Sequence, residues 1–244
     1  MTDVNLIQAF KDAVSILFGE EPNVVFVGMS NIGKTHWSTR LAQSLGMDRI
    51  DFDGLIGQSP AMSDLIKDIE GKDEAERMGI FFGMPWTEGF EERQQKFLDA
   101  EAAVMNDNAN ESNAILDLTG STFLHQQPMD QIAQSGLVIY LEASLEEQEK
   151  ALDGLLADFE QGPKPVCWGD VKRPENKEEL RQQFKELLAY RAKNYAQYAD
   201  VTVPFDVHKN AKTAEDLMEY VLGQLADENP KIAARTQELG LLLN

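Results

Sequence analysis

The chain has 244 residues, 43% of them hydrophobic and 26% charged, which suffices for one α/β domain with additions or for two small domains. Its formal net charge of −20 favours solubility and repels DNA, RNA and anionic lipid, so we expect neither nucleic acid nor a membrane as a partner. The single cysteine excludes an internal disulfide, the N-terminal residues lack the pattern of a secretory signal, and no run of about eighteen apolar residues predicts a membrane span. A cytoplasmic location is therefore expected.

Hydrophobic spacing predicts helices that alternate with short apolar strands along most of the chain. In chain order the predicted elements are helix 4–18, strand 24–27, helix 35–45, strand 49–52, helix 63–76, helix 88–105, strand 114–118, helix 126–134, strand 136–141, helix 145–159, helix 177–195, strand 201–205 and helix 214–225. We expect residues 81–86 to be irregular and residues 161–174, which contain three prolines, to form a loop.

This alternation predicts a central parallel sheet covered by helices on both faces, which is a three-layer αβα fold. No internal repeat or low-complexity linker divides the chain, so the sequence favours a single domain spanning residues 1–244. Its core is expected at about 22–226. The helix over 3–19 and the tail over 227–244, which has room for one more helix, are expected as additions to that core.

The segment Gly28 to Thr35, GMSNIGKT, has the pattern G-x-x-x-x-G-K-[ST] between a predicted strand and a predicted helix. Glycines allow backbone N–H groups to turn toward an anion, and the helix directs its positive end to the same place. Lys34 would contact the β- and γ-phosphates of a nucleotide, and the Thr35 hydroxyl would ligate Mg²⁺. A chance match is the alternative, but the flanking elements favour phosphate binding. The residues expected to bind the nucleotide are Gly28, Ser30, Asn31, Ile32, Gly33, Lys34, Thr35 and His36.

Three aspartates near predicted strand ends are candidates for magnesium and proton chemistry. Asp117 ends an apolar strand, where P-loop enzymes often place a carboxylate directed at Mg²⁺; the alternative is that it caps a turn. Asp51 and Asp53 are two residues apart, and strand alternation would place both on one side. One carboxylate can then hold Mg²⁺ through water while the other accepts a proton from an attacking hydroxyl. The alternative is a pair of solvated loop acids.

Seven segments between about Val24 and Leu225 occur in an order that resembles the shikimate kinase family. They are GMSNIGKT, IDFDGLIG, TEGFEERQQKFLDAE, LDLTGS, GLVIYLEASLEEQEKAL, GPKPV and LAYRAKNYAQYADVTV. The resemblance implies a P-loop kinase fold in which Lys34, Thr35 and Asp51 serve MgATP. It also implies that Asp53 orients and deprotonates the accepting hydroxyl and that Arg191 holds a substrate carboxylate. Without the resemblance, Arg191 reads as a helix-surface arginine paired with a glutamate.

The sequence departs from the family pattern on the side expected to bind the acceptor. The arginine that follows a helical phenylalanine in the family would fall at Glu91, and a glutamate facing a carboxylate substrate would cost roughly 4 kcal/mol. The triple glycine of the family becomes Thr119-Gly120-Ser121, and the arginine of its lid loop becomes Lys164, which keeps the charge but loses the bidentate fork.

We therefore expect an ATP- and Mg²⁺-dependent kinase that phosphorylates a hydroxyl of a small polar metabolite. The expected catalytic residues are Lys34, Asp53 and Lys164. The expected substrate contacts are Asp53, Gly120, Ser121 and Arg191, and the expected metal-binding residues are Thr35, Asp51 and Asp117. The alternative is a nucleotide-binding regulatory or interaction module that has lost kinase activity. The sequence leaves open the identity of the acceptor and whether the protein is a monomer or a dimer.

Overall fold

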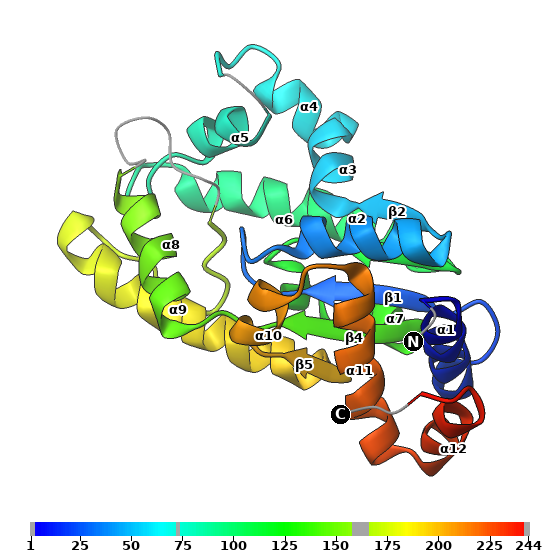
Figure 1. Cartoon of the computed structure of the whole chain (residues 1–244). Helices are drawn as coiled ribbons and strands as arrows, with labels where there is room; N and C mark the ends of the chain where they lie inside the picture. The colour runs from blue at the N-terminus through cyan, green and yellow to red at the C-terminus, as the bar shows by residue number, and fades with distance from the viewer. Residues whose placement is uncertain (1–2, 72–73, 158–165, 242–244) are drawn as a thin grey trace.

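The computed structural model describes residues 3–71, 74–157 and 166–241. In this part of the chain, a parallel five-stranded sheet with strand order β2-β3-β1-β4-β5 forms the centre of the molecule (Figure 1). Its strands are β1 (Asn23–Val27), β2 (Asp48–Asp51), β3 (Ala114–Asp117), β4 (Gly136–Leu141) and β5 (Val201–Val203). The chain runs from β1 outward to β2, returns through β3, and then builds β4 and β5 on the other side. The carboxyl end of β1 therefore lies at the switch point of the sheet, where α/β proteins bind ligands.

The central strands are apolar without alternation because helices cover both faces of the sheet. Every residue of β1 and β4 is buried, and Val25 pairs with Leu116 on one side and with Val138 on the other. The edge strands are more polar, as in β5, where Thr202 is exposed between two buried valines.

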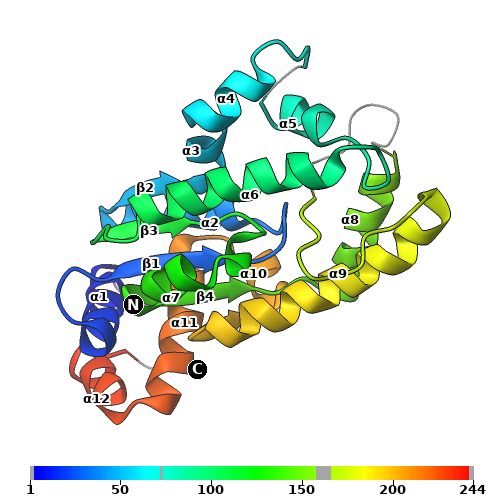
Figure 2. The same cartoon turned by 180° about the vertical axis from the view of Figure 1, so that it is seen from behind.

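Helices form the two outer layers, which confirms the predicted three-layer αβα architecture. One face is covered by α1 (Asp3–Phe18), α2 (Lys34–Leu45) and α11 (Ala214–Glu228) (Figure 1). The opposite face carries α6 (Phe90–Asp107), α7 (Gln126–Gln134) and α9 (Lys177–Tyr198), as the view from behind shows (Figure 2). Outside this frame, α12 (Pro230–Glu238) packs on α1 and α11, and α8 (Leu145–Ala157) packs on α9.

The segment after β2 forms three short helices, which differ from the predicted elements. These are α3 (Phe52–Gln58), α4 (Pro60–Ile66) and α5 (Glu74–Phe82), so the single helix predicted over 63–76 is wrong. Asp51 caps α3 by accepting from the Gly54 amide, and Ser59 caps α4 by accepting from the Met62 amide, with Pro60 in the first helical position. These are strong start signals for helices. α5 also includes Phe81 and Phe82, which begin the segment expected to be irregular.

At the far edge of the sheet, β5 ends at Val203, before the predicted limit, and α10 (Phe205–Asn210) follows at once. Pro204 accounts for the change, because it cannot donate a ladder hydrogen bond and it serves as the cap of α10. Across the described ranges, no helix combines the length and the apolar character needed to cross a membrane.

Candidate active site

The loop between β1 and α2 has the backbone geometry of an anion-binding nest. Gly28 has φ 148°, and a Cβ atom there would lie 2.8 Å from the carbonyl oxygen of Leu141, so only glycine fits. Asn31 and Gly33 adopt φ values of 62° and 109°, in the left-handed region. Successive turns of this kind direct amide N–H groups inward, toward the start of α2. The loop can therefore bind phosphate as the sequence predicts.

Lys34 is the cation of this loop. It is 7% exposed, and its Nζ donates to the carbonyl oxygens of Gly28 at 3.0 Å and Met29 at 3.1 Å. Burial lowers the pKa of Lys34, whereas the negative charges of Asp53 and Asp117 oppose that shift. No carboxylate of the described residues lies within ion-pairing distance of the ammonium group, so its charge is available to a nucleotide phosphate.

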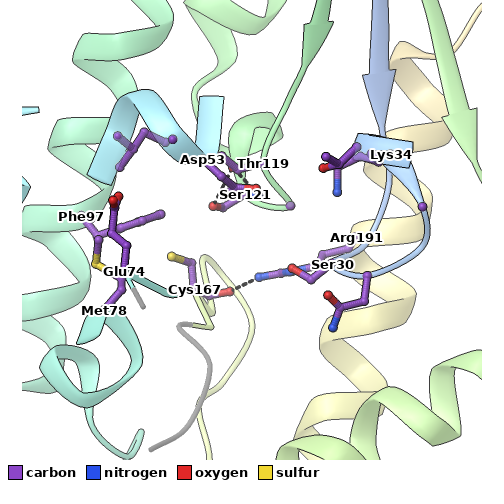
Figure 3. A pocket seen from close by; sticks show the side chains of 16 residues that line it. Ser30, Lys34, Asp53, Glu74, Met78, Phe97, Thr119, Ser121, Cys167 and Arg191 are labelled. Carbon is purple, nitrogen blue, oxygen red and sulfur yellow. Dashed lines mark hydrogen bonds between the residues drawn. The ribbon is translucent and has the colours of Figure 1, made fainter. Parts of the chain in front are cut away.

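A cavity of about 610 Å³ opens beside the loop at the carboxyl edge of the sheet (Figure 3). Ser30, Asn31, Gly33, Lys34 and Thr35 line one side of it. The other walls come from α3, α5, α6, the turn after β3, the segment before α9, and α9 itself. The volume lies in the range of sites for small molecules, and polar groups converge on it from several elements.

Asp53 projects into this cavity from the first turn of α3 (Figure 3). Its side chain is exposed to the cavity. Partial desolvation there raises the pKa of Asp53 to about 6, against the opposing charge of Lys34. The carboxylates of Asp51, Asp117 and Glu101 raise it further. A carboxylate with a pKa near neutrality suits proton abstraction from a hydroxyl.

Arg191 brings a second cation to the cavity from the middle of α9. It is 8% exposed, and its Nη2 donates to the carbonyl oxygen of Cys167 at 2.7 Å (Figure 3). Its Nε has no hydrogen-bond partner, and none of the described carboxylates pairs with its guanidinium. Burying such a charge is unfavourable without a counter-ion, so the site favours an anionic ligand. The alternative of a surface arginine paired with a glutamate is wrong.

A hydrogen-bond network explains the side chains that replace the triple glycine. The Glu101 carboxylate is fully buried, and it accepts hydrogen bonds from the hydroxyls of Ser121, at 2.7 Å, and Thr119. Its other oxygen lies 2.8 Å from Nε2 of His125. Thr119 and Ser121 line the cavity while their hydroxyls satisfy Glu101. Sequence reasoning missed Glu101 and His125, which are 24 residues apart and carry no motif.

Replacing Glu101 with alanine is expected to lower the free energy of unfolding by about 2–4 kcal/mol, because two buried hydroxyls and the part-buried His125 ring would lose their partner. Urea denaturation followed by circular dichroism would measure the change. Glu92→Ala, an exposed substitution on the same helix, serves as the control and is expected to stay within about 0.5 kcal/mol of wild type. Equal stabilities for the two variants would contradict the assigned network.

The other candidates for the nucleotide and magnesium lie outside the cavity lining. Gly28 and Ile32 contribute to the loop without lining the cavity, and the His36 ring packs edge-on against Trp37.

The expected metal-binding aspartates are held by Arg49, which pairs with Asp51 at 3.3 Å and with Asp117 at 2.5 Å. Alternation does not relate Asp51 to Asp53, because β2 ends at Asp51 and Asp53 belongs to a helix. Among the described residues, no group of three or more metal-ligating side chains is present.

The expected position of Glu91 is corrected by the structure. Glu91 is exposed and pairs with Arg173 at 2.9 Å, whereas Phe97, seven residues beyond Phe90, contributes to the cavity wall. The two phenylalanines lie about two turns apart on one helix face, so the sequence pattern fits either of them. The predicted repulsion between Glu91 and a carboxylate substrate is therefore wrong. Lys164 lies outside the described residues.

Comparison with known proteins decides the family. The family model described as "Shikimate kinase" matches residues 72–224, more than half of the chain. The chain belongs to the shikimate kinase family. Among its relatives, the shikimate kinase of Haemophilus influenzae (strain PittEE) is 29% identical over 196 residues, covering 79% of this chain and 88% of the relative. That of Mannheimia succiniciproducens is 27% identical over 206 residues, covering 83% and 96%.

Solved structures of shikimate kinases share the fold. The enzyme from Acinetobacter baumannii, in complex with shikimate, matches with a TM-score of 0.56 at 23% identity, over 88% of this chain and 98% of that chain. The enzyme from Aquifex aeolicus matches with a TM-score of 0.53 at 18% identity, over 84% and 97%. This protein of the shikimate kinase family is thus a small-molecule phosphotransferase whose cofactors are ATP and Mg²⁺. Gly28, where only glycine fits, and the buried Lys34, which has no ion-pair partner among the described residues, suit a bound triphosphate.

Proposed function

We propose that this protein transfers the γ-phosphoryl group of MgATP to a hydroxyl of a small acceptor that carries a carboxylate, with shikimate as the first acceptor to test. The observation that carries the proposal is the convergence of Lys34, Asp53 and Arg191 on one cavity. They supply a cation for phosphate, a base for a hydroxyl and a cation for a carboxylate. The shikimate kinase of A. baumannii binds shikimate in a related fold, which supports an acceptor of this kind.

The phosphate loop would hold the nucleotide through the amides between Gly28 and Thr35, with Lys34 contacting the transferring group. Bound Mg²⁺ would neutralise charge on the phosphates, and the Thr35 hydroxyl is its candidate direct ligand. Because Mg²⁺ usually keeps several waters, Asp51 and Asp117 remain candidates for contacts through water while Arg49 holds them.

The acceptor would lie between Asp53 and Arg191, beside Gly120 and Ser121. Arg191 would fix its carboxylate, and Asp53 would accept the proton of the attacking hydroxyl. Positioning both reactants in this way removes much of the entropic barrier to transfer. Lys164 stays a candidate for stabilising the charge of the transferring group, as the sequence predicts.

Arg191→Lys is expected to raise the KM for a carboxylate acceptor by about 10- to 100-fold, because lysine keeps the charge but loses the paired N–H geometry. The KM for ATP should change by less than about twofold, since the nucleotide would lie against the phosphate loop, on a different wall from Arg191. Steady-state kinetics with each substrate varied in turn would measure both values. The control is Arg181→Lys on the same helix, where Arg181 pairs with the surface acids Glu149 and Asp153. An unchanged acceptor KM would remove Arg191 from the proposed role.

A coupled ADP-release screen over hydroxylated carboxylic acids, shikimate included, tests the proposed function. ADP release that depends on one of these acceptors is expected. ATP binding with no acceptor-dependent release would instead support the alternative of a nucleotide-binding module without kinase chemistry.

A further inference from the structure

Glu74 is a charged residue of the cavity that the proposed reaction does not use. It lies near the start of α5, and Figure 3 shows it with Met78 and Phe97 on the opposite side of the cavity from Lys34. Gly57 on α3 creates the space that its carboxylate occupies, because a Cβ atom at position 57 would collide with the Oε1 of Glu74. The two helices are thus shaped around a carboxylate at this wall.

Among the residues that the structure describes, none compensates the charge of Glu74. None of the described residues donates a hydrogen bond to its carboxylate or forms an ion pair with it. Its neighbours on the cavity wall, Ile56, Met78 and Phe97, are apolar. A half-buried carboxylate in such surroundings is unfavourable until a ligand supplies a counter-charge. The aromatic ring of Phe97 also favours a cation over an anion.

The charges of the cavity favour a cationic group of the acceptor as the partner of Glu74. In the proposed reaction, Lys34 binds the nucleotide, Arg191 binds a carboxylate, and Asp53 accepts the proton of the reacting hydroxyl. A neutral hydroxyl facing Glu74 would donate a hydrogen bond but leave the negative charge uncompensated. An ammonium group would provide both the hydrogen bond and the charge, in a site where an apolar wall strengthens electrostatic attraction.

We propose that Glu74 determines specificity by binding a cationic nitrogen of the acceptor. The acceptor class is then a small hydroxylated carboxylic acid that also carries an ammonium group. Its carboxylate faces Arg191, its reacting hydroxyl faces Asp53, and its ammonium faces Glu74. This inference rests on the proposed function, because it assigns a further contact to the same acceptor.

The test compares shikimate with analogues in which one ring hydroxyl is replaced by an amino group. Dissociation constants are measured by calorimetry with Mg²⁺ and a non-hydrolysable ATP analogue, on wild type and Glu74→Gln. We expect wild type to bind at least one amino analogue about tenfold more tightly than shikimate, and Glu74→Gln to bring that ratio close to one. The control is Asp64→Asn, which removes an exposed acid paired with Lys67 on the neighbouring α4 and should leave the ratio unchanged.

Three outcomes would overturn the inference: wild type binding no amino analogue more tightly than shikimate, Glu74→Gln leaving the ratio unchanged, or wild type binding none of these ligands. A measurement of ADP release with the same ligands separates this inference from the proposed function. Selective binding that depends on Glu74 but leads to no ADP release would uphold the contact and refute the phosphoryl transfer.

Discussion

Lys34→Ala is expected to lower kcat by about 10³-fold or more while the protein stays folded. Lys34 is the only lysine among the described residues that line the cavity, and its ammonium is held by the loop carbonyls of Gly28 and Met29. In transfer of a phosphoryl group, charge develops on oxygens that such a fixed cation stabilises. Removing one preorganised donor of this kind typically costs 10²–10³ in rate, and here the charge is lost as well.

Acceptor-dependent ADP release under saturating MgATP would measure this loss. Circular dichroism and the melting temperature would show whether the variant is folded. Lys67→Ala is the matched control, because Lys67 is an exposed lysine at the end of α4 whose ammonium pairs with Asp64. Undiminished turnover by a folded Lys34→Ala protein would refute the assigned role of the loop.

Asp53→Asn is the second substitution with a large expected effect. Asparagine has nearly the same shape but cannot accept a proton, so we expect kcat to fall by about 10²–10⁴-fold, the range that general bases contribute. Affinity for MgATP, measured by calorimetry, should change by less than about threefold, because the phosphate loop is unaltered. Retained transfer in this variant would remove Asp53 from the role of base.

The pH dependence gives the Asp53 prediction a second measurement. Because the pKa of Asp53 is raised to about 6, the carboxylate form that acts as base is lost as the pH falls through 6, and wild-type activity should fall with it. The residual activity of Asp53→Asn should lack this acidic limb. If the variant keeps the same acidic limb of the pH profile, the limb belongs to a group other than Asp53.

The same shift predicts the effect of Asp53 on stability. A folded-state pKa above the ordinary value near 3.8 means that the folded protein holds this proton more tightly than the unfolded chain does. The resulting stabilisation is complete below about pH 4 and is lost as the pH rises through 6. Asp53→Asn should therefore raise the melting temperature at pH 7.5 relative to wild type, and have little effect at pH 4. Such a trade between stability and activity is common at active sites.

The features predicted well from the sequence are those that local patterns determine. The phosphate loop follows directly from the glycines and Lys34, and the buried strands follow from apolar runs such as 136–141, which became β4 with the same bounds. The helices of the outer layers follow from apolar residues that are spaced so that they fall on one face of a helix. Over 63–76, propensity alone predicted one helix, whereas α4 starts earlier, after the Ser59 cap, and a separate helix α5 begins at Glu74.

The acceptor side of the cavity depends on packing, and for that reason much of it could not be predicted. Glu74 enters the wall only because Gly57 leaves room, and Glu101 meets His125 only because α6 lies beside the turn after β3. Phe90 and Phe97 satisfy the same helical pattern, so only the packing of α6 decides which one lines the cavity. Arg191, which the family motif of the late helix placed in the substrate site, lines the cavity, and its contact with a substrate stays a prediction.

The central claim is that one cavity holds both MgATP and a hydroxylated carboxylic acid and transfers phosphate between them. Its most direct test is incubation with ATP labelled with ¹⁸O at the three terminal oxygens of the γ-phosphate, followed by mass spectrometry of the acceptor. We predict an acceptor phosphate ester that carries all three labelled oxygens, formed by wild type and absent with Lys34→Ala. Label found only in inorganic phosphate, or an equal yield of ester from both proteins, would contradict the account.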